Sequence, residues 1–310
     1  MLHYNLKNIE LNQRLDCNFD YHITEESRLK DGDRNLGKYH KFNKLNDLTS
    51  KEWLKFQKSW FILNPKPRAK NVLLHPAKFP EELVEYFIRF FTKQGDTVLD
   101  PMVGTGSSII SSMDTGRNSI GIELSKKYTN ITENRIRERI DNMEKQKDSK
   151  AKKINIKLYN GDSRNLEQLK MNNIDYCITS PPYWNMLRVK GFETQKIRKD
   201  NDLDLYYSDN KEDLGNIDEY EIFLEELSNI YLKVHNVLKT GGYLTIIVKN
   251  IKKNGKIFSL AWDLANKLKF FTLKDEKIWC QDNVKLAPYG YGYSWVSNTV
   301  HHYCLIFKKE

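Results

Sequence analysis

The sequence predicts an α/β fold, with a mostly parallel sheet that carries helices on both faces. From residue 72 onwards, short apolar segments typical of buried strands alternate with longer segments of helical periodicity. Strands that are joined through helices in this way lie parallel in one sheet. The last two predicted strands follow one another without a helix between them, which predicts a closing antiparallel pair. A chain of 310 residues is long enough for one large domain of this class.

The elements follow in a regular order after a weakly patterned start. Residues 1–70 lack strong periodicity, except that aromatic residues at helical spacing predict a short helix around 49–62, capped by Thr49 or Ser50. Further along the chain we expect strands at 96–100, 118–123, 154–159, 176–179, 243–248, 271–279 and 300–308. We expect helices at 81–91, 107–114, 125–143, 218–238 and 259–268, the fourth ending before Gly241-Gly242.

Composition narrows the class of partner. The 50 Lys and Arg residues exceed the 41 Asp and Glu residues, giving a net charge of +9, and a basic excess favours polyanionic partners. No apolar run reaches the length of a membrane span, and the start lacks a signal-peptide pattern, so we expect a cytoplasmic protein. The scattered cysteines predict neither a zinc site nor a disulfide framework, and no metal is expected; they are Cys17, Cys177, Cys280 and Cys304.

Polar and glycine residues follow the first three strands of the regular region. Asp100-Pro101-Met102-Val103-Gly104-Thr105-Gly106 joins a strand to a helix, where glycines let the backbone approach a ligand and helix-start N–H groups attract negative charge. Glu123 ends the next strand, at a spacing that suits hydrogen bonds to ribose hydroxyls, and Asp162 follows the third strand. The glycine pattern lacks the third glycine of a nicotinamide-dehydrogenase loop. These residues therefore predict a nucleotide-like cofactor at one edge of the sheet.

The fourth strand ends in Thr179-Ser180-Pro181-Pro182-Tyr183-Trp184. The two prolines fix φ and supply no N–H, so the chain leaves the sheet in a rigid loop. This loop offers a hydroxyl, unpaired carbonyls and an aromatic face, which are the groups needed to hold a flat ring that bears an amine. A plain proline turn that closes a strand is the alternative interpretation.

The loop resembles the Ser-Pro-Pro-Tyr signature of DNA methyltransferases that modify exocyclic base amines. The resemblance implies a Rossmann-like seven-stranded fold over residues 71–310, preceded by a 1–70 extension that is a candidate for DNA contact. It also implies S-adenosylmethionine as the cofactor. The residues that match the family's cofactor motifs are His75, Lys78, Phe79, Asp100, Pro101, Gly104, Gly106, Glu123, Asp162 and Ser163.

The same resemblance assigns catalysis to Ser180, Pro181, Pro182 and Tyr183. The Ser180 hydroxyl and the Pro181 carbonyl are expected to accept the two protons of the ring amine, while Tyr183 stacks on a base turned out of the duplex. Serine at this place is commonly associated with N4 of cytosine, although N6 of adenine stays open. Because Cys177 lies inside a strand, covalent attack on cytosine C5 is disfavoured. Trp184, Arg188 and Lys190 are candidate substrate contacts, and Trp184 fits a core position equally well.

The element that reads the target sequence stays open. The candidates are the basic and aromatic segment 185–215, residues 1–70, and the glycine-aromatic stretch 288–295. The expected partner is double-stranded DNA, with a cognate restriction endonuclease or a specificity subunit as a further partner. The alternatives are an RNA methyltransferase with the same core, a catalytically inactive nucleic-acid-binding subunit and, less well matched, a protein-glutamine methyltransferase.

Overall fold

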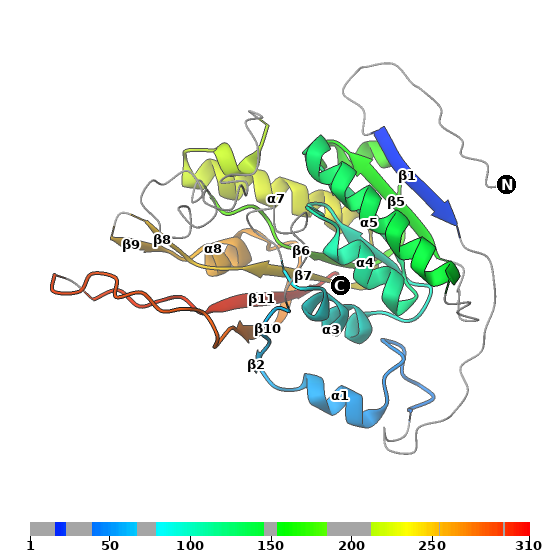
Figure 1. Ribbon diagram of the computed structural model, residues 1–310, viewed down its shortest axis with the longest axis horizontal. Coiled ribbons are helices and arrows are strands. Elements are labelled where there is room, and N and C mark those ends of the chain that lie inside the picture. Colours follow the sequence, from blue (N-terminus) through cyan, green and yellow to red (C-terminus); the bar gives the residue numbers. More distant parts are fainter. Residues whose placement is uncertain are drawn as a thin grey trace.

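The computed structural model describes residues 16–22, 39–66, 79–145, 154–184, 212–253, 255–293 and 295–310. Within these ranges the chain forms a nine-stranded sheet in the order β1-β5-β4-β3-β6-β7-β11-β10-β2, drawn in Figure 1. The strands are β1 (Asp16–His22), β2 (Trp60–Ile62), β3 (Thr97–Asp100), β4 (Asn118–Glu123), β5 (Asn155–Asn160), β6 (Ile174–Thr179), β7 (Leu238–Val248), β10 (Thr272–Cys280) and β11 (His301–Lys308). The hairpin of β8 (Ile251–Lys253) and β9 (Lys256–Phe258) forms a separate small sheet.

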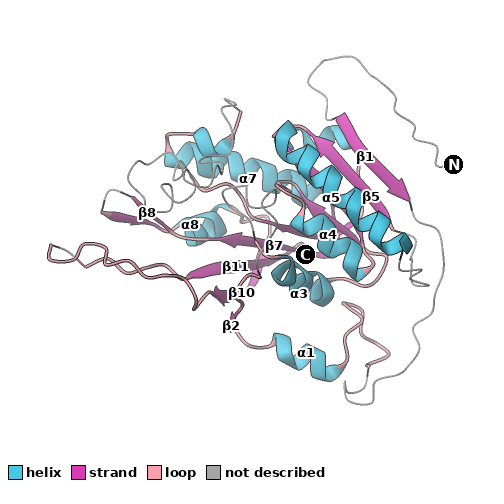
Figure 2. Ribbon diagram, in the orientation of Figure 1, coloured by secondary structure: helices cyan, strands magenta, loops and turns pink. Residues whose placement is uncertain are grey.

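The helices lie in layers on the two faces of the sheet (Figure 2). They are α1 (Ser50–Phe56), α3 (Glu81–Phe91), α4 (Ser107–Thr115), α5 (Lys126–Lys145), α7 (Tyr220–Val237) and α8 (Leu260–Lys267), with 3-10 turns η1 (Ser163–Leu169) and η2 (Leu214–Asn216). Side chains alternate between the two faces of a strand, so neighbouring residues of β3 belong to core layers on opposite faces of the sheet. Leu99 joins the core under α7 and α8, whereas Val98 joins the core under α3 and α1.

The strand directions confirm the predicted fold class. Strands β5, β4, β3, β6 and β7 pair in parallel, and β11 is antiparallel to both of its neighbours, β7 and β10. These seven strands make the predicted mostly parallel sheet with its closing antiparallel strand. Strand β1 adds an antiparallel edge beside β5, and the short strand β2 adds a parallel edge beside β10.

The prediction of a helix over 49–62 is wrong for the second half of this range. Thr49 does cap α1, in a capping box with Glu52, but the helix ends at Phe56. Residues 60–62 form β2 instead, because the free edge of β10 offers them backbone hydrogen bonds. Of the aromatic stripe, Phe56 is the fully packed member: its ring stacks on Phe90 with centroids 3.6 Å apart.

The end of α7 also differs from the prediction. The helix ends at Val237 and β7 begins at the next residue, so Gly241 and Gly242 lie inside the strand and do not cap the helix. Gly241 adopts φ +82°. Its N–H donates to the Lys309 carbonyl over 2.7 Å, which ties the start of β7 to the chain that leaves β11.

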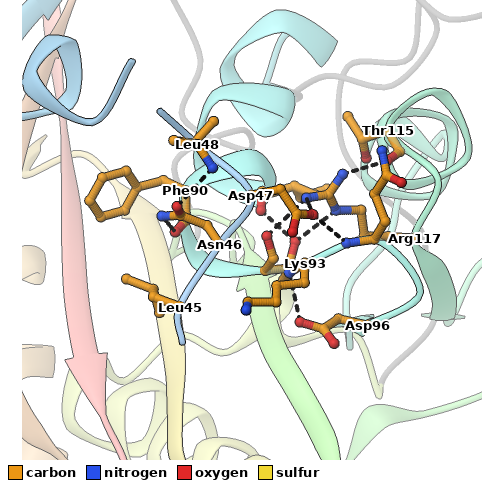
Figure 3. A network of polar contacts seen from close by, with 12 residues as sticks. Leu45, Asn46, Asp47, Leu48, Phe90, Lys93, Asp96, Thr115 and Arg117 are labelled. Carbon is orange, nitrogen blue, oxygen red and sulfur yellow. Dashed lines mark hydrogen bonds and ion pairs between the residues drawn. The ribbon is translucent and has the colours of Figure 1, made fainter. Parts of the chain in front are cut away.

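A polar network fixes the segment just before α1 to the amino end of the sheet (Figure 3). Asn46 donates to the Phe90 carbonyl over 2.7 Å, and Asp47 accepts the Gln94 N–H. Arg117, 2% exposed, donates to the Thr92 carbonyl and lies 3.6 Å from an oxygen of Asp47. Burial lowers the pKa of this guanidinium to about 10. The segment before α1 is therefore packed at the end of the sheet opposite the polar strand ends described below.

Across the described ranges, no helix combines the length and apolarity needed to cross a membrane.

Candidate active site

A pocket opens at the carboxyl ends of β3, β4, β5 and β6, the edge where ligands bind in sheets of this type. It brings together Glu123 from the end of β4, Asp162 from the end of β5 and Ser180 from the end of β6. The remaining lining residues are Pro101, Met102, Leu124, Ser125, Tyr128, Ser163, Pro182, Glu212, Asp213, Leu214 and Ile230. The candidate cofactor acids and the candidate catalytic serine thus share one pocket.

Glu123 is the best-defined acid of this pocket. Its side chain accepts the Gly104 N–H over 2.9 Å through one oxygen and the Ser125 N–H over 2.8 Å through the other. The residue is 9% exposed, and burial raises the pKa of its carboxyl to about 8, with a smaller contribution from Asp213. Each carboxylate oxygen can accept a further hydrogen bond, so Glu123 can hold two neighbouring hydroxyl groups of a ligand.

Asp162 is held by an arginine that sequence reasoning missed. Its carboxylate accepts the Arg164 N–H over 2.8 Å at the start of η1 and also accepts Nε of the same residue over 2.8 Å. Arg164 further donates to the Glu212 carbonyl over 2.7 Å and lies 3.3 Å from Glu226. The guanidinium therefore ties the end of β5 to the segment that begins at residue 212. Its position two residues after Asp162 was the available signal, although the partners at 212 and 226 are far away in sequence.

The glycine loop uses most of its N–H groups within the protein. Met102 donates to Asp100, Val103 to the Ile122 carbonyl, Gly104 to Glu123 and Gly106 to the Val103 carbonyl. These four N–H groups are therefore taken by acceptors within the protein, whereas the predicted attraction of negative charge concerned the N–H groups at the start of α4. The loop serves as a rigid wall whose residues Pro101 and Met102 face the pocket.

Both predicted glycines have backbone conformations that favour glycine: φ is +57° at Gly104 and +88° at Gly106. Helix α5 packs close against them. Thr132 donates its hydroxyl to the Gly104 carbonyl over 2.9 Å, and a Cβ at position 106 would lie 2.6 Å from Cγ2 of Thr132. Arg135, one turn further on, donates to the Thr105 carbonyl and to Glu81 of α3. Thr132 and Arg135 of α5 therefore hold the glycine loop in place through hydrogen bonds to its carbonyls. The sequence of this helix indicated only that it is polar.

Asp100 has a structural role in the glycine loop. It is fully buried and accepts the Ser108 hydroxyl over 2.6 Å and the Met102 N–H over 3.0 Å. Burial raises the pKa of its carboxyl to about 6. Asp100 therefore fixes the glycine loop through Met102 and Ser108, and its contact with a ligand stays a prediction. Ser163 does line the pocket and donates its hydroxyl to the Pro101 carbonyl.

Two more predicted cofactor contacts belong to the protein interior. Phe79, 7% exposed, packs in the core under α3 and is not a lining residue. Gly106 is the residue before the first turn of α4 and faces Thr132. His75 and Lys78 lie outside the described residues, as do Arg188, Lys190 and most of the predicted 185–215 insertion.

The Ser-Pro-Pro-Tyr loop enters the pocket with Ser180 and Pro182, while Pro181 is buried. Tyr183 is partly buried, which raises the pKa of its phenol above the ordinary value. Trp184 is 6% exposed, donates its indole N–H to the Asp218 carbonyl over 3.1 Å and packs against Tyr220. Of the two interpretations of Trp184, the structure therefore supports the core position and corrects the predicted base contact.

Cys177, Cys280 and Cys304 carry free thiols. Cys177 is fully buried in β6, and burial raises the pKa of its thiol well above the ordinary value. A thiol held in this form is a poor nucleophile, which is consistent with the expectation that the chemistry does not pass through it.

A mostly parallel seven-stranded core with a pocket at its carboxyl edge is the Rossmann-like arrangement that the resemblance to methyltransferases predicts. Residues 10–134 match the family model described as DNA methylase. The match covers β3, the glycine loop and β4 up to and beyond Glu123.

Parts of the chain are also similar to type II methyltransferases. The chain is 40% identical over 81 residues to the type II methyltransferase M.MjaI of Methanocaldococcus jannaschii, covering 26% of this chain and 27% of that protein. It is 31% identical over 123 residues to the type II methyltransferase M2.DpnII of Streptococcus pneumoniae, covering 39% of this chain and 45% of that protein. These matches confirm the predicted resemblance to N4-cytosine and N6-adenine DNA methyltransferases. The chain spans less than half of the length of these two relatives.

Among solved structures, a putative DNA modification methylase from Thermus thermophilus is 24% identical, with a TM-score of 0.31 over 48% of this chain and 50% of that one. A putative rRNA methylase from Clostridium thermocellum is 14% identical, with a TM-score of 0.43 over 76% of this chain and 99% of that one.

Proposed function

We propose that this protein is an S-adenosylmethionine-dependent DNA methyltransferase that transfers a methyl group to an exocyclic base amine, with N4 of cytosine as the first candidate. The observation that carries the proposal is the shared pocket: Ser180 lines the same cavity as Glu123 and Asp162. Double-stranded DNA is the proposed substrate. A restriction–modification or host-defence system, with a cognate endonuclease or specificity subunit, is the proposed setting.

The pocket suits S-adenosylmethionine by charge and by shape. Four acidic residues line it, Glu123, Asp162, Glu212 and Asp213, in a chain whose net charge is +9. Carboxylate groups in this lining favour a ligand that carries a sulfonium and an ammonium group, and such a ligand in turn favours the ionised form of Glu123. Apolar groups from Met102, Leu124, Tyr128 and Ile230 complete the lining, as expected for a site that holds a flat adenine ring. When bound, this cofactor supplies an electrophilic methyl group.

Within this arrangement Glu123 accepts hydrogen bonds from the ribose hydroxyls, and Asp162 accepts one from the adenine amino group. The lone pair of a base amine is delocalised into its ring, so the amine is a weak nucleophile. Ser180 Oγ and the Pro181 carbonyl accept its two N–H groups and localise that lone pair toward the methyl group. Tyr183 holds the base by stacking once the base has left the duplex. Catalysis then rests mainly on positioning, and the surplus proton of the methylated amine leaves to water.

The choice between the two base amines follows from the first residue of the loop. Serine at position 180 favours N4 of cytosine through the resemblance described above. The family model covers methylases of both kinds, so N6 of adenine is the second candidate.

The test is methyl transfer from labelled S-adenosylmethionine to duplex DNA, with tRNA and rRNA as competing substrates and nucleoside mass spectrometry to identify the product. Replacing Ser180→Ala is expected to lower kcat about 100-fold, because one proton acceptor at the reacting amine is lost. Cofactor affinity, measured by calorimetry, should change less than about twofold, since the hydroxyl is assigned to the base. Ser59→Ala, at an exposed serine outside the pocket, is the matched control. Unchanged turnover in Ser180→Ala, or methylation of RNA alone, would contradict the proposal.

A further inference from the structure

The connection between β10 and β11 is an aromatic arm, residues 281–300, that projects away from the body of the molecule (Figure 1). Near its tip Tyr291 is 86% exposed, Tyr293 99% and Trp295 88%. Gly290 and Gly292 adopt φ +72° and +82°, so the backbone turns at each glycine. The tyrosines that follow these turns, Tyr291 and Tyr293, have their rings outside the core. Large aromatic side chains held in water in this way mark a surface that contacts a partner.

The aromatic arm leaves the sheet at the same edge as Ser180. Strand β11 is antiparallel to β7, and β10 is antiparallel to β11, so β10 runs in the same direction as the parallel strands β6 and β7. The end of β10 at Cys280 and the start of β11 at His301 therefore lie at the carboxyl edge. In strand order this edge runs β6-β7-β11-β10, from the catalytic loop to the arm.

A basic hairpin, β8–β9, contacts both the aromatic arm and the end of the Ser-Pro-Pro-Tyr loop. Lys252 donates its ammonium group to the Ser297 carbonyl over 2.6 Å and to its hydroxyl over 2.9 Å, which fixes the hairpin to the arm. On the other side, Lys253 Nζ lies 3.9 Å from the ring centroid of Trp184, at the end of the Ser-Pro-Pro-Tyr loop. The surface is therefore continuous from the catalytic loop, through the basic hairpin, to the aromatic arm.

The charges of this surface select the partner. Residues 249–258 contain four lysines and no Asp or Glu: Lys249, Lys252, Lys253 and Lys256. In the arm, Asp282 is the one acidic residue, and it accepts a hydrogen bond from Asn64 over 2.7 Å. Lysines beside exposed aromatic rings are the combination that binds phosphates and stacks on bases.

We propose that the aromatic arm and the basic hairpin form the surface that holds double-stranded DNA around the base to be methylated. The exposed Lys256 contacts a backbone phosphate, the other lysines add positive charge, and Tyr291, Tyr293 and Trp295 stack on bases that lose a neighbour when the target leaves the duplex. This inference rests on the proposed function and deepens it, because it places the DNA on the β7-β11-β10 side of Ser180.

The experiment measures binding of the full chain to a fluorescein-labelled DNA duplex by anisotropy, separately from methyl transfer. The variant Tyr291→Ala/Tyr293→Ala/Trp295→Ala is expected to bind at least about tenfold more weakly, because stacking contacts are lost. Tyr291→Phe/Tyr293→Phe keeps the rings and should bind within about twofold of the original chain. Phe42→Ala/Leu54→Ala is the matched control, since both side chains are 69% exposed and lie outside the arm. Lys256→Gln should reduce the slope of log affinity against log salt concentration by about one, which corresponds to the loss of one phosphate contact.

Cofactor affinity in the triple variant should stay unchanged, which shows that the chain is folded. Duplex affinity equal to that of the original chain in this folded variant would overturn the inference, as would an equal loss in the Phe42→Ala/Leu54→Ala control. Stronger arm-dependent binding to RNA than to DNA would overturn the assignment of the partner. The proposed function fails on a different result, namely absence of methyl transfer by the original chain, so the two can be told apart.

Discussion

The carboxyl edge of the sheet divides into two halves of opposite character. The acidic half, at the ends of β5, β4 and β3, carries Glu123 and Asp162 beside a glycine loop. The basic half, after β7 and between β10 and β11, carries the lysine hairpin and the aromatic arm. Ser180, at the end of β6, lies where the two halves meet.

The halves also differ in how their side chains are held. In the acidic half, backbone N–H groups and Arg164 fix the carboxylates, and helix α5 fixes the loop. In the basic half, rings such as Tyr293 are almost fully exposed. A small cationic ligand is bound tightly by preformed partners in a pocket, whereas a long polyanion is bound by an extended surface. This contrast is expected if, as proposed, one edge of the sheet serves two ligands of opposite charge.

Replacing Glu123→Ala is the strongest way to break this division. Loss of a charged acceptor for two hydroxyls, together with the loss of partners for two backbone N–H groups, is expected to weaken cofactor binding about 100-fold. Calorimetric titration with S-adenosylhomocysteine would measure it. Duplex binding should stay within about twofold, because the basic half is untouched. Loss of both affinities together would show that the halves are not independent.

The pH dependence of cofactor binding sharpens the same contrast. The pKa of the Glu123 carboxyl lies at about 8 in the protein, raised from 4.5 by burial. Hydroxyl donors favour the ionised form, so binding releases a proton, and affinity should rise by up to about tenfold per pH unit until about pH 8 and level off above it. Stability has the opposite sign: the folded chain holds this proton and the unfolded chain does not, so the Glu123 contribution falls as pH rises between these values.

Calorimetry in buffers of different ionisation enthalpy would count the released protons directly. A cofactor affinity that stays flat from about pH 6 to about pH 8, just below the raised pKa, would contradict the role given to Glu123.

A smaller effect is expected at Gly106. An alanine Cβ would adopt a disfavoured φ of +88° and would lie 2.6 Å from Thr132 Cγ2. We expect Gly106→Ala to lower the free energy of unfolding by about 1–2 kcal/mol and to weaken cofactor binding a few-fold, as measured by urea unfolding and calorimetry. The double variant Gly106→Ala/Thr132→Ser removes the clashing methyl group and keeps the hydroxyl that bonds the Gly104 carbonyl, so it should recover part of the loss. Absence of any recovery would show that backbone strain alone explains the effect.

The regular part of the fold could be predicted because its signals are local. The segments 81–91 and 118–123 have the predicted bounds in the structure. Errors arose where a tertiary partner overrode a local pattern. Residues 60–62 continue the aromatic spacing of α1, yet they pair with β10, and Gly241-Gly242 has the composition of a helix end, yet lies inside β7.

The site shows the same division. The sequence by itself determined which residues end the strands, and therefore that Glu123, Asp162 and Ser180 lie at one edge, because parallel strands present their carboxyl ends together. Only the tertiary structure decided which side chains face the pocket. It buried Asp100, Phe79 and Trp184 and recruited Arg164 and Thr132, since burial and long-range hydrogen bonds depend on elements far apart in the chain.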